Sequence, residues 1–299
     1  MLRLGAHESV AGGLHRAIER GELAGCESLQ LWTRNARRWY SPPLDVDQIE
    51  QFRTALAETD IYPVAAHAAY LINIASPDPD LFRRSVQCLI EETQRCELLG
   101  IPYIILHPGA HTGSGMEAGL ARAAAGLSDM AAALPGCRTR ILLETTAGQG
   151  SALGATFEEL ALIIEQISAD LQPGICLDTC HTFSAGYELR TAEGYARTME
   201  EFDRWLGREV LKVIHLNDSR FPRGSRRDRH QHIGEGHLGL DGFAHLLADR
   251  QLDGLPGILE TPKSDDLHED RENLARLRAL AAGLPVEIEP LASDKENTE

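Results

Sequence analysis

The sequence predicts an α/β protein that folds as a closed (β/α)8 TIM barrel in a single domain. Short apolar runs alternate with longer helical patterns along the chain, and there are eight of each. The length agrees, because the chain has 299 residues and such a barrel takes about 250. No low-complexity linker divides the chain. A doubly wound open sheet is the alternative, and the eightfold count favours the barrel.

The predicted strands are short and rich in Ile, Leu and Val, as expected for parallel strands buried on both faces. In chain order they are Leu2–Ala6, Ser28–Trp32, Tyr62–Ala66, Tyr103–Leu106, Ile141–Leu143, Ile175–Leu177, Lys212–Leu216 and Gly257–Leu259.

The predicted helices carry apolar residues at helical spacing. They are Leu14–Leu23, Asp45–Thr59, Pro79–Leu99, Met116–Leu134, Phe157–Leu171, Ala192–Trp205, Leu240–Arg250 and Asp266–Leu280. Thr156 and Glu159 match a capping box at the start of one of them. We predict that the barrel occupies residues 1–286 and that the acidic segment 287–299 is a disordered tail.

Composition and charge exclude several classes of protein. Hydrophobic residues make up 43% and charged residues 25% of the chain, so it is neither disordered nor membrane-embedded. A net charge of −16 argues against broad nonspecific DNA binding, unless bound cations or a local basic surface intervene. The six cysteines include no CxxC pair, which favours reduced thiols. With no signal peptide and no long apolar run, we predict a cytoplasmic monomer that contacts no membrane.

Polar residues follow or end the predicted strands at one consistent place, the carboxyl end. They are His7, His67, His107, Glu144, Asp178, His215 and Glu260. In a barrel these ends converge on one mouth, where active sites of this fold lie. A single histidine of this kind is more often a packed structural residue. So many at equivalent positions predict a functional site.

The residue types in this set are those that bind divalent metals such as Zn²⁺. Two local patterns enlarge it: Asp178-x-x-His181, and Asp228-x-His230, in which alternation lets both side chains face one ion. The candidate ligands are His67, His107, Glu144, Asp178, His181, His215, Asp228, His230 and Glu260. They are too many for one tetrahedral ion, so two or three metals are implied. The remaining histidines are interpreted as helix residues (His15, His245, His268), rim residues (His111, His232, His237) and a pocket residue that binds no metal (His7).

Segments spread over nearly the whole chain resemble, in order, the endonuclease IV family of apurinic/apyrimidinic endonucleases. They are GAHESVAGG at 5–13, HAAYLINIA at 67–75, HPG at 107–109, LETTAGQG at 143–150, CLDTCH at 176–181, HLNDS at 215–219, DRHQHIGEG at 228–236 and LETP at 259–262. The resemblance implies a barrel with three zinc ions that cuts duplex DNA 5′ to an abasic site, leaving a 3′-hydroxyl and a 5′-deoxyribose phosphate.

The resemblance also assigns the ligands to three ions. His67, His107 and Glu144 hold the first, Glu144 bridges to a second held by Asp178, His215 and Glu260, and the third is held by His181, Asp228 and His230. Manganese or iron is compatible with part of this carboxylate-rich set.

Glu144 is the catalytic candidate. Two cations roughly 3.5 to 4 Å apart can generate a bridging hydroxide and hold a phosphodiester in line, and Glu144 is placed to orient that nucleophile or to receive its proton. Thr145 stands where the family pattern LENTAGQG has Asn. We expect this departure to alter hydrogen bonds around the ligands without removing one.

Recognition of DNA is predicted from two arginine-rich loops, the first of which also carries aromatic residues, and from a Tyr-Leu pair that would more usually be part of the core. Arg34, Arg37 and Arg38 precede Trp39 and Tyr40, and Arg229 belongs to an arginine-rich run at 220–229. From the residues alone, a solvated loop is an equal alternative for the first. The resemblance implies that Arg37, with Tyr70 and Leu71, bends the duplex and turns out the abasic nucleotide.

Two other functions are compatible with parts of the pattern. A metal-dependent sugar isomerase of similar architecture would place His, Glu and Asp at the same strand ends, but needs neither a third ion nor a basic mouth. A noncatalytic barrel that binds damaged DNA would be expected to lack some ligands, yet the whole set is present.

Overall fold

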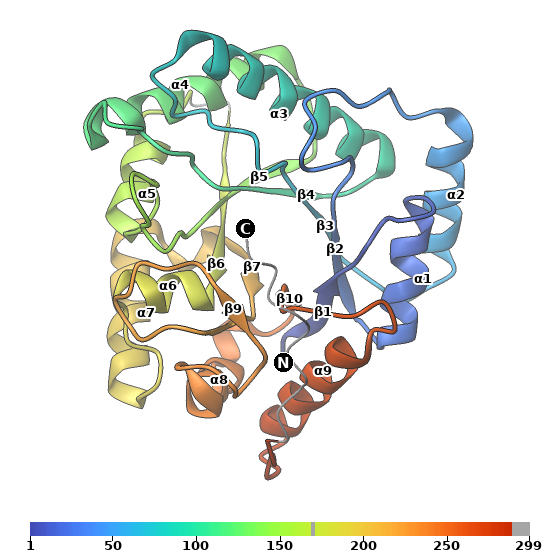
Figure 1. Ribbon diagram of the computed structural model, residues 1–299, viewed down its shortest axis with the longest axis vertical. Helices are drawn as coiled ribbons and strands as arrows, with labels where there is room; N and C mark the ends of the chain where they lie inside the picture. The colour runs from blue at the N-terminus through green and yellow to red at the C-terminus, as the bar shows by residue number, and fades with distance from the viewer. Residues whose placement is uncertain (169–170, 289–299) are drawn as a thin grey trace.

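The computed structural model describes residues 1–168 and 171–288, and at its centre parallel strands close into a barrel. The strands neighbour one another in the order β1-β10-β7-β6-β5-β4-β3-β2. Figure 1 looks onto these strands with the helices around them. The bounds are β1 (Arg3–His7), β2 (Ser28–Leu31), β3 (Val64–His67), β4 (Tyr103–Leu106), β5 (Arg140–Glu144), β6 (Gly174–Asp178), β7 (Leu211–His215) and β10 (Pro256–Leu259). The predicted fold class is confirmed.

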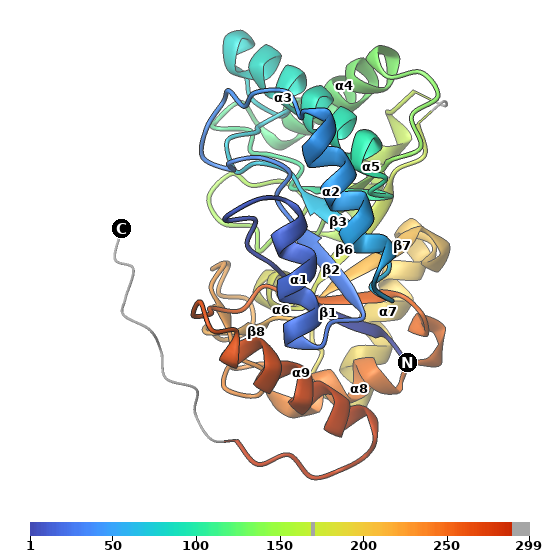
Figure 2. The same cartoon turned by 90° about the vertical axis from the view of Figure 1, so that its right-hand side faces the viewer.

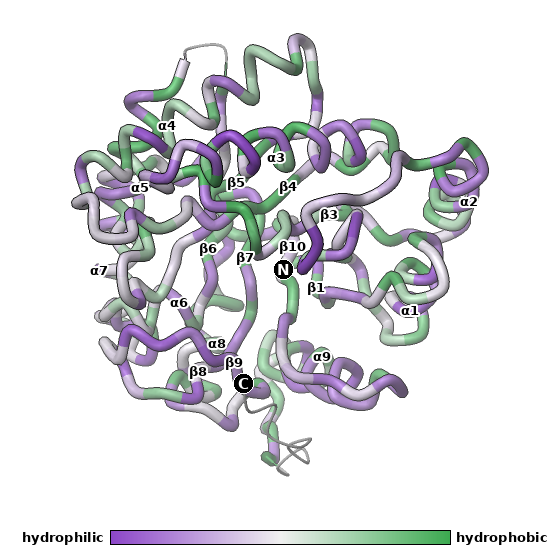
Figure 3. Tube along the Cα trace, turned by 45° about the horizontal axis from the view of Figure 1, so that its top comes forward, coloured by the Kyte–Doolittle hydropathy of each residue, from purple (hydrophilic) through white to green (hydrophobic). Residues whose placement is uncertain are grey.

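The helices that follow the strands cover the outside of the barrel. They are α1 (His15–Ala24), α2 (Val46–Ala57), α3 (Pro79–Leu99), α4 (Met116–Ala133), α5 (Phe157–Glu165), α7 (Ala192–Leu206), α8 (Gly239–Ala248) and α9 (His268–Ala281). In the side view, α1 and α2 lie in front of the first strands, and α9 lies below them (Figure 2). Along α3 the trace alternates between hydrophilic and hydrophobic stretches (Figure 3), as expected for a helix with one face on the core.

Local capping explains where several helices begin. Asp45 and Gln48 form a reciprocal capping box at α2. At α5, Thr156 accepts from the Glu159 backbone N–H as predicted, but the Glu159 carboxylate turns instead to the backbone N–H groups of Gly154 and Ala155 at 2.7 and 3.1 Å. The cap therefore also fixes the loop before the helix.

Some predicted boundaries were wrong, and some elements were missed. Helix α5 ends at Glu165 rather than at Leu171; residues 169–170 lie outside the described residues. The missed elements are α6 (Thr179–Ala185), β8 (Asp218–Ser219), β9 (His230–Gln231) and the 3-10 turns η1 (Arg208–Val210) and η2 (Arg250–Leu252). All are too short to show a periodic pattern and depend on tertiary contacts. The boundary at 286 stays a prediction, and residues 289–299 of the predicted tail lie outside the described residues.

A layer of apolar side chains fills the barrel below the mouth. It consists of Ala65, Ile105, Leu142, Cys176, Val213 and Ile258, all fully buried. Because side chains alternate along an extended strand, the residue two positions later points to the same side. Those residues are His67, His107, Glu144, Asp178, His215 and Glu260. The candidate ligands thus form the next layer above this packed interior. Within the described ranges, no helix is both long and apolar enough to cross a bilayer.

Truncating this interior layer is expected to destabilise the barrel. Leu142 is fully buried two residues before Glu144, so Leu142→Ala should lower the free energy of unfolding by about 2–5 kcal/mol through lost burial and a residual cavity. Chemical denaturation followed by circular dichroism measures the change. Leu284→Ala is the control because Leu284 is 58% exposed. Equal small effects in both variants would contradict the packed interior.

Candidate active site

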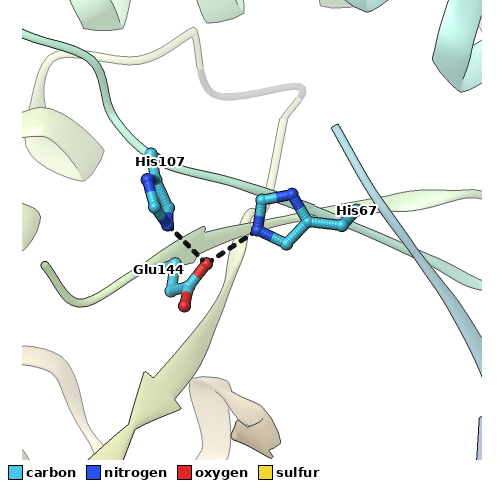
Figure 4. Close-up of side chains that lie close together, drawn as sticks. All are labelled: His67, His107 and Glu144. Atoms are coloured by element: carbon cyan, nitrogen blue, oxygen red, sulfur yellow. Dashed lines mark hydrogen bonds and ion pairs between the residues drawn. The ribbon is translucent and has the colours of Figure 1, made fainter. Parts of the chain in front are cut away.

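Glu144, at the end of β5, lies at the centre of the polar layer. Its Oε2 atom is 3.0 Å from Nε2 of both His67 and His107, as Figure 4 shows. Its Oε1 atom is 2.9 Å from Nδ1 of His215. The two carboxylate oxygens therefore face different sets of histidines, which is the arrangement needed for a carboxylate that bridges two cations.

A second group surrounds His215 on β7. Its Nδ1 atom lies 3.1 Å from Oε2 of Glu260 and 3.8 Å from Oδ2 of Asp178. Asp178 and His215 are paired in register across β6 and β7. Together with Glu144 these residues place one ligand atom each within 4.8 Å of one another. The strand register alone thus assembles a site with three carboxylates and one imidazole.

A third group is assembled by the short elements α6 and β9. Asp178 caps α6 by accepting from the His181 backbone N–H at 2.7 Å, which places His181 one turn beyond the strand end. Pairing of β9 with β8 brings His230 to the same place. Asp228 Oδ1 then lies 3.1 Å from Nε2 of His181 and 3.5 Å from Nε2 of His230.

The hydrogen bonds of the histidines determine which ring nitrogen faces the site. Nδ1 of His67, His181 and His230 lies 2.8, 2.9 and 3.1 Å from the backbone carbonyls of Ala68, Thr145 and Glu260, respectively. A carbonyl only accepts, so each Nδ1 carries a proton and each Nε2 is the atom that faces the site, where it can offer a lone pair once it is deprotonated. Metal-binding histidines are oriented in this way. Nε2 of His67 and of His181 faces a carboxylate, and among the described residues Nε2 of His230 has no hydrogen-bond partner.

The buried carboxylates of the site need positive charge close to them. Burial by itself raises the pKa of Glu144, but His215 and His107 hold it well below the ordinary carboxyl value. Burial lowers the pKa of His181, yet Asp178 and Asp228 together raise it well above the ordinary imidazole value. Protons on the histidines therefore balance the carboxylates when no other cation is present. Divalent ions supply the same balance and release those protons.

The donor set fits divalent metal ions. All the facing atoms are imidazole nitrogens and carboxylate oxygens, which suit zinc and also manganese or iron. Cys176 lies beside Glu144 and His215, but burial raises the pKa of its thiol to about 12, so it stays a neutral packing residue. Every predicted ligand is brought to this one mouth. Their metal binding stays a prediction.

Comparison with known proteins agrees with this geometry. Residues 18–281 match the family model described as a xylose isomerase-like TIM barrel. A probable endonuclease 4 of Chloroflexus aurantiacus is 48% identical over 283 residues, covering 95% of this chain and 99% of the relative. The crystal structure of endonuclease IV from Thermus thermophilus superposes with a TM-score of 0.83 at 34% identity, covering 94% of this chain and 99% of that one. The chain belongs to the endonuclease IV family.

A more distant likeness concerns the fold alone. A D-tagatose 3-epimerase-like protein superposes with a TM-score of 0.72 at 19% identity, covering 94% of this chain and 99% of that one. The barrel of this endonuclease IV family member is therefore shared with a protein that is much less similar in sequence.

Two polar residues that hold the candidate ligands were missed in the sequence analysis. Gln30 on β2 lies 2.8 Å from Nε2 of His215 through its Oε1 atom, and its amide donates to Glu260 Oε1 at 2.6 Å. Asn217 donates to Asp178 Oδ2 at 2.7 Å and accepts from the Glu260 backbone N–H at 2.8 Å. A buried amide within an otherwise apolar run, as at Gln30, was the available signal. These amides fix the directions of residues from three strands.

Thr145, which stands where the family pattern has Asn, lies among the candidate ligands and makes hydrogen bonds to residues around them. Its hydroxyl oxygen accepts from the Asp178 backbone N–H at 2.9 Å and from Thr182 at 3.2 Å. Its carbonyl orients His181. His7 is buried against Trp32 with ring centroids 4.1 Å apart; its place in the pocket without a metal stays a prediction. His232 was interpreted wrongly as a rim residue; it is buried beside Asn273.

The predicted DNA-contacting residues lie around the mouth with different degrees of exposure. Tyr70 is 61% exposed, packs edge-on against Trp32 and lines the same cleft as His67 and His107. Leu71 is half-buried, and the side chains of Arg37 and Arg229 are exposed. Arg34 differs from the predicted basic loop, because its side chain is 1% exposed and faces the interior. Contact of the exposed residues with DNA stays a prediction.

Gln30 offers a test of how the site is held together. In Gln30→Ala, His215 loses the acceptor for its outer nitrogen and Glu260 loses a donor, so metal affinity should fall about 10- to 100-fold. Competition with a chromogenic chelator measures this affinity. Gln51→Ala, on the exposed surface of α2, is the control. An unchanged affinity in Gln30→Ala would show that the strand ends position the ligands without this amide.

Proposed function

We propose that this chain is an apurinic/apyrimidinic endonuclease that hydrolyses the phosphodiester 5′ to an abasic site in duplex DNA, leaving a 3′-hydroxyl and a 5′-deoxyribose phosphate. The observation that carries the proposal is the position of Glu144, whose two oxygens face separate groups of histidines in a member of the endonuclease IV family. We place the enzyme in the cytoplasm as a monomeric DNA-repair protein.

Three divalent ions, mainly zinc, are proposed for the three groups of ligands. When bound, such ions neutralise the phosphodiester, lower the pKa of a water nucleophile and stabilise the leaving oxygen. The protein's own contribution is to keep each ligand in one orientation. Glu144 receives or directs the proton of the attacking water because it is the carboxylate common to the first two groups.

Recognition of the lesion is proposed for the rim. Tyr70 stands beside the ligand-lined cleft and, with Leu71, presents an aromatic and apolar surface that can occupy the space left by a missing base. Arg37 and Arg229 supply positive charge on two sides of the mouth. The chain's net charge of −16 disfavours binding to intact duplex. The positive charge of these two arginines offsets it locally at the mouth.

The third group of ligands favours this function over sugar isomerisation. His181, Asp228 and His230 come from α6, the loop before β9 and β9 itself, outside the strand-end layer. A proton or hydride shift in a small sugar needs at most two metals, so this group and the rim arginines would have no purpose there. The complete set of ligands likewise favours an enzyme over a noncatalytic damage sensor.

The number of metal ions per chain tests the proposed three-ion site. Protein purified without chelators should carry about three divalent ions per chain, mainly zinc, because the ligands divide into three groups of three or four. Plasma emission spectroscopy on protein of known concentration gives the number. Full activity with one ion per chain would refute the three-ion site, whereas manganese or iron in one position would leave it intact.

Incision of abasic DNA tests the function itself. A labelled duplex with one abasic site should be cut on its 5′ side to give a 3′-hydroxyl end, and Glu144→Gln should lower the rate about 100-fold or more because a shared negative ligand is lost. Gel mobility of the product ends measures both. His245→Gln on α8 is the control and should retain activity.

Two further assays on the same protein preparation separate the alternative functions. Aldose substrates should remain unchanged in the first of them, an isomerisation assay. Isomerisation without DNA cleavage would establish the sugar isomerase, and tight binding of abasic DNA without cleavage by metal-loaded protein would establish the damage sensor. Equal losses of activity in Glu144→Gln and in a folded His245→Gln would mean that the site lies elsewhere.

A further inference from the structure

We propose that the buried ion pair of Arg34 and Glu92 is a positioning unit that ties together the two loops that recognise the lesion. The first loop is residues 33–42, which carry Arg37, and the second is residues 68–76, which carry Tyr70 and Leu71. This inference rests on the proposed function, because it concerns loops to which DNA contacts are assigned. Arg34 and Glu92 touch no DNA and act through the backbone of these loops.

The Arg34 guanidinium holds the first loop from within. It donates to the backbone carbonyls of Arg38, at 3.1 Å, and Trp39. These carbonyls follow Arg37 directly in the chain. Because the guanidinium is a rigid planar fork, it fixes the two peptide groups relative to each other. An exposed arginine contacting DNA would be free in solution, whereas Arg34 is immobilised with a side chain only 1% exposed.

Glu92 on α3 holds the second loop in the same way. Its carboxylate oxygens lie 3.3 and 3.2 Å from the backbone nitrogen of Ala69, which donates to them. Ala69 immediately precedes Tyr70. The side chain of Glu92 is 1% exposed, and its Oε1 atom is 3.9 Å from Nε of Arg34, so the two form an ion pair without a direct hydrogen bond. One buried charge pair therefore connects the peptide after Arg37 with the peptide before Tyr70.

Helix α3 is the common support of this connection. Arg34 also lies 3.3 Å from Glu91 Oε2 and 3.3 Å from Cys88 Sγ, both on α3. From the next turn, Arg95 donates to the carbonyls of Thr33, at 2.9 and 2.6 Å, and Pro42, at 2.9 Å, at the two ends of the first loop. The helix thus fixes where the first loop begins and ends, while Arg34 and Glu92 set its position relative to the second.

The consequence concerns binding more than chemistry. Of the candidate metal ligands, only His67 shares a peptide group with this pair, because the Ala68 carbonyl faces its Nδ1 atom while the Ala69 N–H donates to Glu92. The Ala68 N–H also donates to the Ile105 carbonyl, which keeps His67 on its strand, so loosening the pair acts mainly on the loops. Arg37 and Tyr70 would instead sample several positions and would have to be ordered when the distorted duplex binds. That ordering weakens binding of abasic DNA, and a displacement of about 1 Å in such positioning groups can cost about 100-fold.

Arg34→Ala and Arg34→Lys are the informative variants. Burial raises the pKa of Glu92 to about 7 even though Arg34 lowers it, so Glu92 can take up a proton when its partner is removed. Arg34→Lys keeps the positive charge but lacks the fork that reaches two carbonyls. Arg208→Ala is the matched control. Arg208 lies in η1, directly before β7, and is also paired with a carboxylate, that of Asp249 at 3.1 Å.

The experiment measures kcat and KM for incision of a duplex with a single abasic site, with zinc-loaded protein. Arg34→Ala should raise KM about 10- to 100-fold with kcat within about threefold, and Arg34→Lys should lie between this variant and wild type. Arg208→Ala should keep the wild-type KM. If Arg34→Ala does not fold, Arg34→Lys decides the question. A wild-type KM in the folded Arg34 variants, or a fall in kcat alone, overturns the proposal.

Hydrogen exchange provides a second readout that a general loss of stability does not reproduce. In the protein without DNA, peptides covering residues 68–72 should exchange faster in Arg34→Ala although the substituted residue belongs to the other loop. The same peptides should be unchanged in Arg208→Ala. Unchanged exchange in Arg34→Ala overturns the coupling. If wild type itself shows no preference for abasic over intact duplex, the proposed function fails, and that result is distinct from wild-type-like behaviour of the variants.

Discussion

The alternation of side chains along eight parallel strands is the constraint on which this molecule depends. It places Ala65, Ile105, Leu142 and their neighbours in a closed apolar layer, and it forces the residues two positions later into the same interior. Because the barrel is closed, those residues meet one another at its mouth. Glu144 can therefore contact His67, His107 and His215, which come from three other strands or the residues just after them.

This gathering of polar groups places several carboxylates where protonated histidines must balance their charge. Glu144 and Asp178 are fully buried, and burying a carboxylate is costly unless opposite charge is close. The backbone carbonyls that orient His67, His181 and His230 turn the Nε2 atoms toward the same space. Apolar packing below and fixed hydrogen bonds around the layer prevent these groups from turning away. The stability of the barrel thus keeps these carboxylates and imidazoles together.

The sequence predicted the barrel and the cluster of candidate ligands at its mouth because both follow from local patterns. A strand that ends in His67 or Glu144 is visible as an apolar run followed by a polar residue. Gln30 and Asn217 were missed because their partners lie on other strands, and spacing along one strand carries no information about them. The burial of Arg34 and His232 was likewise invisible. In both, a residue type that is usually exposed or intermediate is buried by tertiary hydrogen bonds.

The part of the site that strand alternation does not explain comes from elements added at the mouth. Asp178 begins α6 and so delivers His181. Asp218 on β8 accepts hydrogen bonds from the backbone N–H groups of Gly234, Gly236, Leu238 and Gly239 and thereby ties down the loop that follows His230. Gly236 is required there, because a Cβ atom would collide with Asp218 Oδ1. The strands of the barrel position the candidate ligands of the first two groups, and these short elements position those of the third group. Differences in function between proteins of this fold are therefore expected in such elements rather than in the strands.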